Sequence, residues 1–126
     1  MINVLIVDDH PVMRELLRQV LETYSDVSIA AEAINGEDAV RHAARLQPAV
    51  AIVDIHLPMM DGIEATKQIK LRSPGTVVIG LTAGEPDERD MAMTSAGASS
   101  VINKADVVRS LYPAIVDAVR NLKAAI

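Results

Sequence analysis

The stretch Val4-Leu5-Ile6-Val7-Asp8-Asp9-His10 decides the fold of this 126-residue chain. Its four consecutive apolar residues are typical of a strand that is buried on both faces, as in a parallel sheet covered by helices. Two carboxylates follow the strand, and Pro11 stands where a helix would begin. The stretch therefore predicts a buried strand, a polar loop and a helix in immediate succession.

The same order of elements repeats along the chain. Short β-branched apolar runs alternate with segments of helical period, which is typical of βα units around a parallel sheet. The predicted strands cover residues 3–7, 27–31, 50–53, 77–81 and 100–102. The predicted helices between them cover about residues 12–22, 37–46, 62–71 and 87–95. Without an internal repeat or a linker, the chain is expected to form one doubly wound α/β domain over residues 1–126.

The last predicted helix contains a proline. Apolar residues at helical spacing, from Leu111 to Val119, lead toward the C-terminus. A helix that began near Val107 would place Pro113 in its interior, where proline removes a backbone hydrogen bond and costs about 3 kcal/mol. Two alternatives follow: the helix kinks at Pro113, or it begins close to Pro113 with Ser110 as its cap.

Composition disfavours several classes of protein. The formal net charge of −5 disfavours direct binding to nucleic acid, which normally needs a basic patch. The chain has no cysteine and therefore no disulfide or thiolate metal site, in agreement with a reducing compartment. No apolar run is long enough to span a bilayer and no signal peptide is evident, so we expect no membrane partner and a cytoplasmic location.

Polar side chains follow four of the predicted strands. Asp8 and Asp9 follow the first strand, and Asp54, Thr82 and Lys104 stand at the ends of the third, fourth and fifth. Each has an ordinary explanation when taken singly: the acid pair could cap a helix, and the others could be a turn former, a strand end and a solvated charge. In an open α/β sheet, however, ligands bind beyond the carboxyl ends of the strands. These side chains should therefore lie together at one edge of the sheet.

Together, these residues predict a site for phosphoryl transfer. Carboxylates gathered on one edge repel one another, and a divalent cation relieves that repulsion. Oxygen ligands without sulfur favour Mg²⁺, which takes few carboxylates and leaves room for a phosphoryl oxygen. Lys104 would then supply positive charge to a second phosphoryl oxygen, and Thr82 would donate a hydrogen bond to the third.

Four motifs in the expected order resemble the receiver domain of response regulators. They are residues 4–10, residues 54–62, the pair Thr82-Ala83 and residues 97–104, and the resemblance extends over about residues 2–122. The resemblance implies a flavodoxin-like fold, in which a five-stranded parallel sheet of order 2-1-3-4-5 has helices on both faces.

The resemblance also implies roles for the acidic residues. Asp54 would accept a phosphoryl group from the phosphohistidine of a sensor histidine kinase. Asp9, with Asp8 acting through water, would hold Mg²⁺ together with Asp54 and the backbone carbonyl of His56. His56 and Gly84 lie two residues beyond the nucleophile and the hydroxyl, and we expect them to set the lifetime of the acyl phosphate because they border the path of an attacking water.

By the same resemblance, Thr82 and Lys104 would supply the hydroxyl group and the ammonium group of the phosphoryl site. Two residues near Lys104 depart from the family's pattern. Val101 stands three residues before the lysine, where the family usually has Tyr or Phe, so no aromatic ring can swing inward there. Thr82 must therefore signal by another route. Ala105 replaces a proline that often has a cis peptide, and a cis bond before any other residue costs about 2.5 to 4 kcal/mol.

The sequence Asp8-Asp9-His10-Pro11 resembles the branch of response regulators that carries a LuxR-type helix-turn-helix output domain. No such module is present, so the chain is either a stand-alone receiver or an excised one, and we favour an excised receiver that reaches DNA through a missing C-terminal domain. We expect the chain to catalyse only its own phosphotransfer and autodephosphorylation. Phosphorylation should promote a homodimer through the fourth and fifth helices or the first and fifth, by way of residues 83–87.

Other functions fit the site less well. A phosphatase on this fold would typically have a second acid two residues after the nucleophile, where this chain has His56. A flavin carrier would need aromatic walls and a phosphate-binding loop, which Asp8 and Asp9 oppose. A zinc site would need more than His10 and His56, because His42 lies in a predicted helix away from that edge. An adaptor that keeps only the fold would not need the whole set of site residues.

Overall fold

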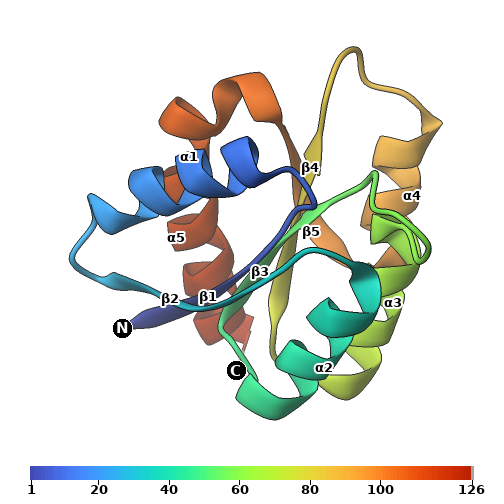
Figure 1. Cartoon of the computed structure of the whole chain (residues 1–126). Coiled ribbons are helices and arrows are strands. Elements are labelled where there is room, and N and C mark those ends of the chain that lie inside the picture. Colours follow the sequence, from blue (N-terminus) through green and yellow to red (C-terminus); the bar gives the residue numbers. More distant parts are fainter. Residues whose placement is uncertain (126) are drawn as a thin grey trace.

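Strands and helices alternate in a computed structural model of the chain, which describes residues 1–125 and side chains as far as residue 121. The elements are β1 (Ile2–Val7), α1 (Pro11–Glu22), β2 (Val27–Ala33), α2 (Gly36–Leu46), β3 (Val50–Asp54), α3 (Gly62–Arg72), β4 (Val77–Thr82), α4 (Glu88–Ala96), β5 (Ala98–Asn103), the 3-10 turn η1 (Lys104–Asp106) and α5 (Val107–Ala125). The strands form one parallel sheet in the order β2-β1-β3-β4-β5, with helices on both faces (Figure 1). The predicted fold class and strand order are confirmed.

Alternating side chains along each strand build one core on each face of the sheet. In β1, Val4 and Ile6 belong to the core shared with α1 and α5, whereas Leu5 and Val7 belong to the core shared with α2, α3 and α4. This division explains why β1 is a continuous apolar run rather than an alternating one. The helices contribute Leu17, Leu21, Leu111 and Ile115 to the first core and Ala39, Ala43, Ile69 and Met93 to the second. Each fully buried Leu or Ile side chain stabilises the fold by about 1.5–3 kcal/mol.

Two strands extend by more than one residue beyond their predicted ranges. Strand β2 continues to Ala33, because Glu32 and Ala33 pair with the last residues of β1. Strand β5 begins at Ala98, which pairs with Val78 of β4. In both cases pairing with a neighbouring strand extends an element beyond the apolar run that predicted it.

Helix α5 continues through Pro113. It begins at Val107, directly after η1, so the alternative in which Ser110 caps a later start is wrong. Pro113 is exposed, whereas Leu111 and Ile115 on either side of it are fully buried, and their burial offsets the lost backbone bond. Although α5 is the longest helix, neither it nor any other described helix combines the length and apolarity needed to cross a membrane.

The chain's two aromatic rings stack on each other at one end of the molecule. The ring centroids of Tyr24 and Tyr112 lie 3.6 Å apart with 2° between the planes. The hydroxyl of Tyr112 donates to Asp26 Oδ2 at 2.8 Å, and the backbone oxygen of Asp26 accepts from Ile2 N at 2.8 Å. Since Ile2 begins β1, the stack lies at the amino edge of the sheet.

Helix α3 begins in direct contact with the end of β3. Asp61 caps the helix by accepting from Glu64 N at 2.9 Å, and Gly62 N donates to the Ile55 carbonyl at 2.9 Å. A Cβ atom on residue 62 would overlap the carbonyl oxygen of Asp54 and lie 2.7 Å from Ile55 Cα. Glycine therefore allows the helix to start this close to the strand that carries Asp54.

Replacing Gly62 with alanine should destabilise the chain. The added methyl group would overlap backbone atoms that cannot rotate away, and overpacking of this kind typically lowers the free energy of unfolding by about 1–3 kcal/mol. Urea unfolding followed by circular dichroism measures the change. The control is Gly75→Ala, where no atom lies within 4 Å of the new methyl group and the change should stay within about 0.5 kcal/mol. Equal losses in the two variants would contradict this explanation.

Candidate functional site

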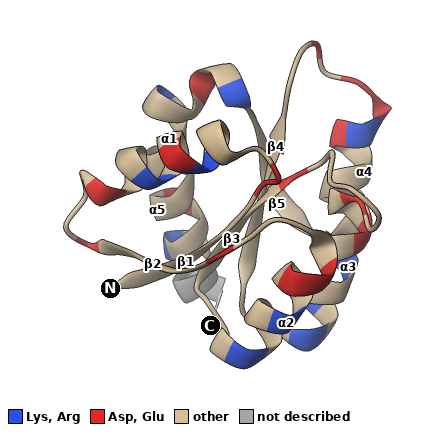
Figure 2. Cartoon of the chain, in the orientation of Figure 1, with Lys and Arg blue, Asp and Glu red and all other residues tan. Residues whose placement is uncertain are grey.

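The site residues predicted from the sequence lie together at the carboxyl edge of the sheet. Asp8 follows β1, Asp54 is the last residue of β3 and Thr82 is the last residue of β4, and all three are buried. Lys104 directly follows β5. Because β1 and β4 both pair with β3, the parallel register brings these strand ends side by side, and Figure 2 shows acidic residues gathered where β1 and β3 end.

Lys104 forms ion pairs with two of the carboxylates. Its Nζ lies 3.0 Å from Asp8 Oδ2 and 3.0 Å from Asp54 Oδ2, and it donates a hydrogen bond to the Asp54 oxygen. The other oxygen of Asp54 accepts from the backbone N–H of His56 at 3.0 Å. Both oxygens of Asp54 are therefore held, which fixes the orientation of its carboxylate.

Burial and ion pairing shift the pKa values of these groups in opposite directions. Burial raises the pKa of the Asp54 carboxyl, the hydrogen bonds from Lys104 and His56 N–H lower it, and the charge of Asp8 raises it, so the pKa lies above its ordinary value. Burial lowers the pKa of Lys104, but the ion pairs with Asp8 and Asp54 outweigh burial and the pKa is raised. Lys104 therefore stays charged at neutral pH.

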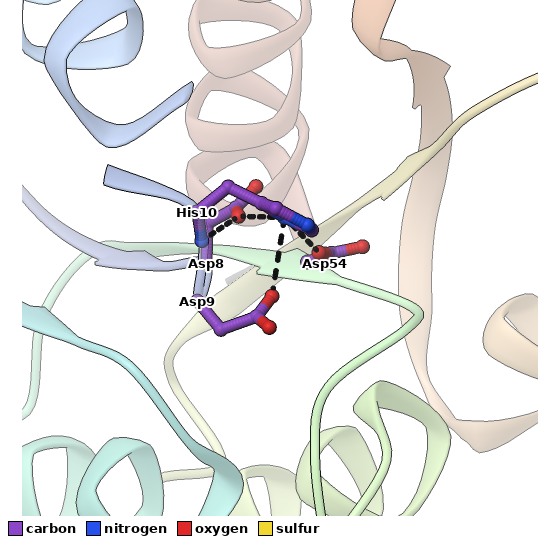
Figure 3. A group of neighbouring side chains, drawn as sticks. All are labelled: Asp8, Asp9, His10 and Asp54. Carbon is purple, nitrogen blue, oxygen red and sulfur yellow. Dashed lines mark hydrogen bonds and ion pairs between the residues drawn. The ribbon is translucent and has the colours of Figure 1, made fainter. Parts of the chain in front are cut away.

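His10 belongs to the site, although no role there was predicted for it. Its Nδ1 lies 3.1 Å from Asp8 Oδ1, 3.2 Å from Asp9 Oδ1 and 3.9 Å from Asp54 Oδ2 (Figure 3). Its backbone N–H also donates to Asp8 Oδ1 at 2.9 Å. The one signal in the sequence was its position beside the acid pair. His42 lies in α2 outside this group, so within the described residues the acids are joined by a single histidine.

The donor set at this edge fits a hard divalent cation. Ligand atoms of Asp8, Asp9, His10 and Asp54 all lie within 4.8 Å of one another. Asp9 Oδ1 and Asp8 Oδ2 are buried without a hydrogen-bond partner, although His10 Nδ1 lies 3.2 Å from the Asp9 oxygen and Lys104 Nζ lies 3.0 Å from the Asp8 oxygen. Buried carboxylate oxygens without partners are unfavourable, and oxygen-rich sets without sulfur suit Mg²⁺. The residues present therefore fit this ion.

The loop after Thr82 is exposed and tied to β5. Residues 83–87 are all exposed, and Gly84 has a φ of 78°. The side chain of Asn103 donates from Nδ2 to the Gly84 carbonyl at 2.8 Å and accepts at Oδ1 from Ala105 N at 3.0 Å. None of the described peptide bonds is cis, so the bond preceding Ala105 is trans.

A contact that no sequence pattern indicated joins the loop after β3 to α4. Arg89, the second residue of α4, places Nη1 at 2.7 Å from Nδ1 of His56. Both side chains are exposed, and the loop after β3 lies beside the start of α4 (Figure 1). The two residues are 33 positions apart in the sequence, which is why local spacing could not predict the contact.

The fold and the acidic edge together define a class, that of α/β domains suited to phosphoryl transfer. Comparison with protein families then identifies the family. The model of the response regulator receiver domain matches residues 4–115, and the chain belongs to this family. The chain is a receiver domain of two-component signalling systems.

Curated relatives include proteins with different outputs. The chain is 38% identical over 115 residues to the transcriptional regulatory protein LiaR of Bacillus subtilis. This alignment covers 91% of the chain and 54% of LiaR. It is 35% identical over 114 residues to a protein-glutamate methylesterase/protein-glutamine glutaminase of Syntrophus aciditrophicus. This alignment covers 89% of the chain and 33% of that relative. The chain thus spans about a third to a half of these relatives' length.

Solved structures agree with this assignment. The response regulator domain of Thermotoga maritima CheB matches the chain with a TM-score of 0.88 at 29% identity, over 95% of this chain and 97% of that one. The response regulator ChrA of a heme-sensing two-component system matches with a TM-score of 0.78 at 30% identity, over 94% of this chain and 57% of that one. The receiver therefore accounts for nearly all of this chain but for just over half of ChrA.

Replacing Asp54 with asparagine should stabilise the metal-free chain at neutral pH. The pKa of Asp54 is higher in the folded chain than in the unfolded chain. Ionised Asp54 therefore lowers the free energy of unfolding at a pH above its folded-state pKa. This loss of stability disappears as the pH falls below the unfolded-state pKa, because the group is then protonated in both states. We expect a higher melting temperature for Asp54→Asn than for wild type in EDTA near pH 7, and a smaller difference at acidic pH. Thermal unfolding followed by circular dichroism measures both.

The control for this comparison is Asp117→Asn, which changes an exposed carboxylate on α5. It should leave the melting temperature unchanged at both pH values, because an exposed charge is well solvated. A lower melting temperature for Asp54→Asn at neutral pH would contradict the raised pKa.

Proposed function

We propose that Asp54 accepts the phosphoryl group in this receiver domain. The observation that supports the proposal best is the geometry of the Asp54 carboxylate, which is buried at the end of β3 with one oxygen 3.0 Å from Lys104 Nζ. Its other oxygen is held by the backbone of His56, and the carboxylate of Asp8 lies close by. The match of the receiver family model over residues 4–115 supports the same role.

The proposed reaction transfers a phosphoryl group from a phosphohistidine of a sensor histidine kinase. An oxygen of Asp54 attacks phosphorus, the P–N bond breaks and its electron pair stays on the imidazole of the kinase, so that an acyl phosphate forms. Lys104 offers its ammonium group to one phosphoryl oxygen, and it needs no proton transfer to do so. Thr82, at the end of the neighbouring strand, offers its hydroxyl as a hydrogen-bond donor to another.

Mg²⁺ is the cofactor that the acidic edge would hold. Asp9 and Asp54 would be direct ligands, together with Asp8 through water and the backbone carbonyl of His56. The support for this choice is the set of oxygen donors and the buried Asp9 oxygen that has no hydrogen-bond partner. When bound, the ion supplies positive charge that offsets both the carboxylates and the transferred phosphoryl group.

The receiver would act by switching an output domain rather than by acting on an external substrate. LiaR is named as a transcriptional regulatory protein, and it aligns with 91% of this chain but over only 54% of its own length. The motif Asp8-Asp9-His10-Pro11 also resembles the branch with a DNA-binding output domain. We therefore favour control of transcription, with DNA bound by the output domain and not by this acidic chain.

Phosphorylation should depend on Asp54 and on a divalent cation. Incubation with acetyl phosphate and Mg²⁺ should add the mass of one phosphoryl group to the wild-type chain, and the Asp54→Asn variant should gain none because it lacks the nucleophile. Excess EDTA should prevent the gain in the wild type. Intact-mass spectrometry measures the product, and Asp117→Asn is the control that should behave as wild type. A labile phosphoryl group on Asp54→Asn at the normal rate would overturn the assignment.

We also propose that phosphorylation promotes a homodimer. The exposed apolar side chains include Met91 on α4 and Val108 on α5, the helices of one predicted interface, and Val12 on α1, a helix of the other. Val101 of β5 is half-buried against the core shared with α2, α3 and α4. Because residue 101 has no aromatic ring, the exposed loop of residues 83–87 would transmit the conformational response from the phosphoryl site to the dimer interface.

The activated chain should therefore associate more tightly than the inactive one. Beryllofluoride with Mg²⁺ mimics the phosphoryl group, and an allosteric coupling of ordinary size would raise dimer affinity by a factor of about five to 150. Sedimentation velocity with and without beryllofluoride measures the monomer fraction. Met91→Glu should weaken the activated dimer if α4 and α5 form the interface, and Val12→Glu should weaken it if α1 and α5 do. Identical monomer fractions in both states would rule out the dimer switch.

A further inference from the structure

The contact between His56 and Arg89 spans two elements beside the phosphoryl site. His56 follows Asp54 by two residues, and its backbone N–H is bonded to the Asp54 carboxylate at 3.0 Å. The backbone of His56 is therefore fixed beside the site, and its exposed side chain starts from this fixed point. Nη1 of Arg89 reaches Nδ1 of this ring from the start of α4, at 2.7 Å.

The chemistry of the two groups determines which nitrogen of His56 carries the proton. A guanidinium group can only donate hydrogen bonds, so Nδ1 of His56 must accept and must be unprotonated. The ring proton of the neutral imidazole then lies on Nε2. With Nδ1 engaged by Arg89 and Nε2 protonated, the ring of His56 has no free lone pair that could accept a proton from water.

The position of Arg89 is not explained by the needs of its own helix. Asp87 caps α4 and fixes the backbone of Arg89, whose N–H donates to Asp87 Oδ1 at 2.8 Å. A cation in the first turn is unfavourable to the helix dipole. Arg18 pairs with a carboxylate of its own helix and Arg109 pairs with Asp106 of the adjoining turn η1, whereas among the described residues the guanidinium of Arg89 contacts His56.

We infer that Arg89 is a positioning residue that holds His56 across the entrance of the site and prolongs the life of the acyl phosphate. The inference rests on the proposed role of Asp54. In hydrolysis, the oxygen of a water molecule bonds to phosphorus, the bond from phosphorus to the Asp54 oxygen breaks and its electron pair returns to the carboxylate. The proton that the water gives up passes to the solvent, because the ring of His56 cannot accept it while Arg89 is bound.

Removing Arg89 frees the ring in two ways. His56 can rotate away from the entrance and admit water, and either ring nitrogen can become a proton acceptor. Both changes speed hydrolysis, and both require His56. The effect of Arg89 should therefore vanish when the imidazole is absent, which distinguishes positioning through His56 from a direct electrostatic effect of the arginine.

The test combines dephosphorylation rates with a spectroscopic readout of the ring. The chain is phosphorylated with acetyl phosphate and Mg²⁺, and loss of the phosphoryl group is followed by intact-mass spectrometry. Arg89→Ala should lose it about two- to tenfold faster than wild type, the factor expected for one hydrogen bond. Arg89→Lys keeps a donor and should recover part of the wild-type rate. In a His56→Ala background, Arg89→Ala should change the rate by less than about twofold.

The ¹⁵N shifts of the His56 ring report its tautomer in the unphosphorylated chain, where catalysis plays no part. Nδ1 should give the shift of an unprotonated acceptor in the wild type, and that shift should move toward the average of a free imidazole in Arg89→Ala. Arg109→Ala, which removes an exposed arginine from α5, is the matched control and should leave both the shift and the rate unchanged.

The outcomes separate this inference from the proposed function. If the wild-type chain takes up no phosphoryl group, the role of Asp54 is wrong and the inference fails with it. If it does, equal dephosphorylation rates for wild type and Arg89→Ala would overturn the inference alone. A full effect of Arg89→Ala in the His56→Ala background would also overturn it, because Arg89 would then act without the imidazole.

Discussion

Three carboxylates share the carboxyl edge of the sheet with one ammonium group, and this excess of negative charge governs the site. Lys104 lies 3.0 Å from oxygens of both Asp8 and Asp54, while an oxygen of Asp9 is buried without a hydrogen-bond partner. Burial raises the pKa of the Asp54 carboxyl, and the negative charge of Asp8 raises it further. The site is thus short of positive charge, and a bound cation would supply it and at the same time prepare the edge for an anionic phosphoryl group.

The parallel sheet is what brings these charges together. The parallel strands end at the same edge, and polar residues stand at or directly after the ends of β1, β3, β4 and β5. The close approach of Gly62 to the backbone of Asp54 holds α3 against the end of β3. The core that covers both faces therefore also fixes the position of the reactive carboxylate, so stability and site geometry are coupled at this point.

Most of the fold could be predicted from the sequence because it depends on local patterns. The apolar run 4–7 indicated a doubly covered strand, and the polar residues after four strands indicated the shared edge. The end of β2 at Ala33 could not be predicted, and the sequence left open whether α5 begins near Val107 or near Pro113, since pairing and burial by distant residues decide both. The contacts of His10 and Arg89 with the site were likewise missed, because they depend on side-chain directions in loops and on residues far apart in sequence.

The stacked tyrosines have a consequence for how this chain is observed by optical methods. The chain has no tryptophan or phenylalanine, so Tyr24 and Tyr112 are its entire aromatic complement, and both belong to one stack at the amino edge of the sheet. Near-ultraviolet absorption and intrinsic fluorescence therefore sample a single spot where the end of α1 meets α5. Events at the opposite edge would be silent in these signals unless they moved α5, and a change in tyrosine emission would report that the far side of the domain had responded.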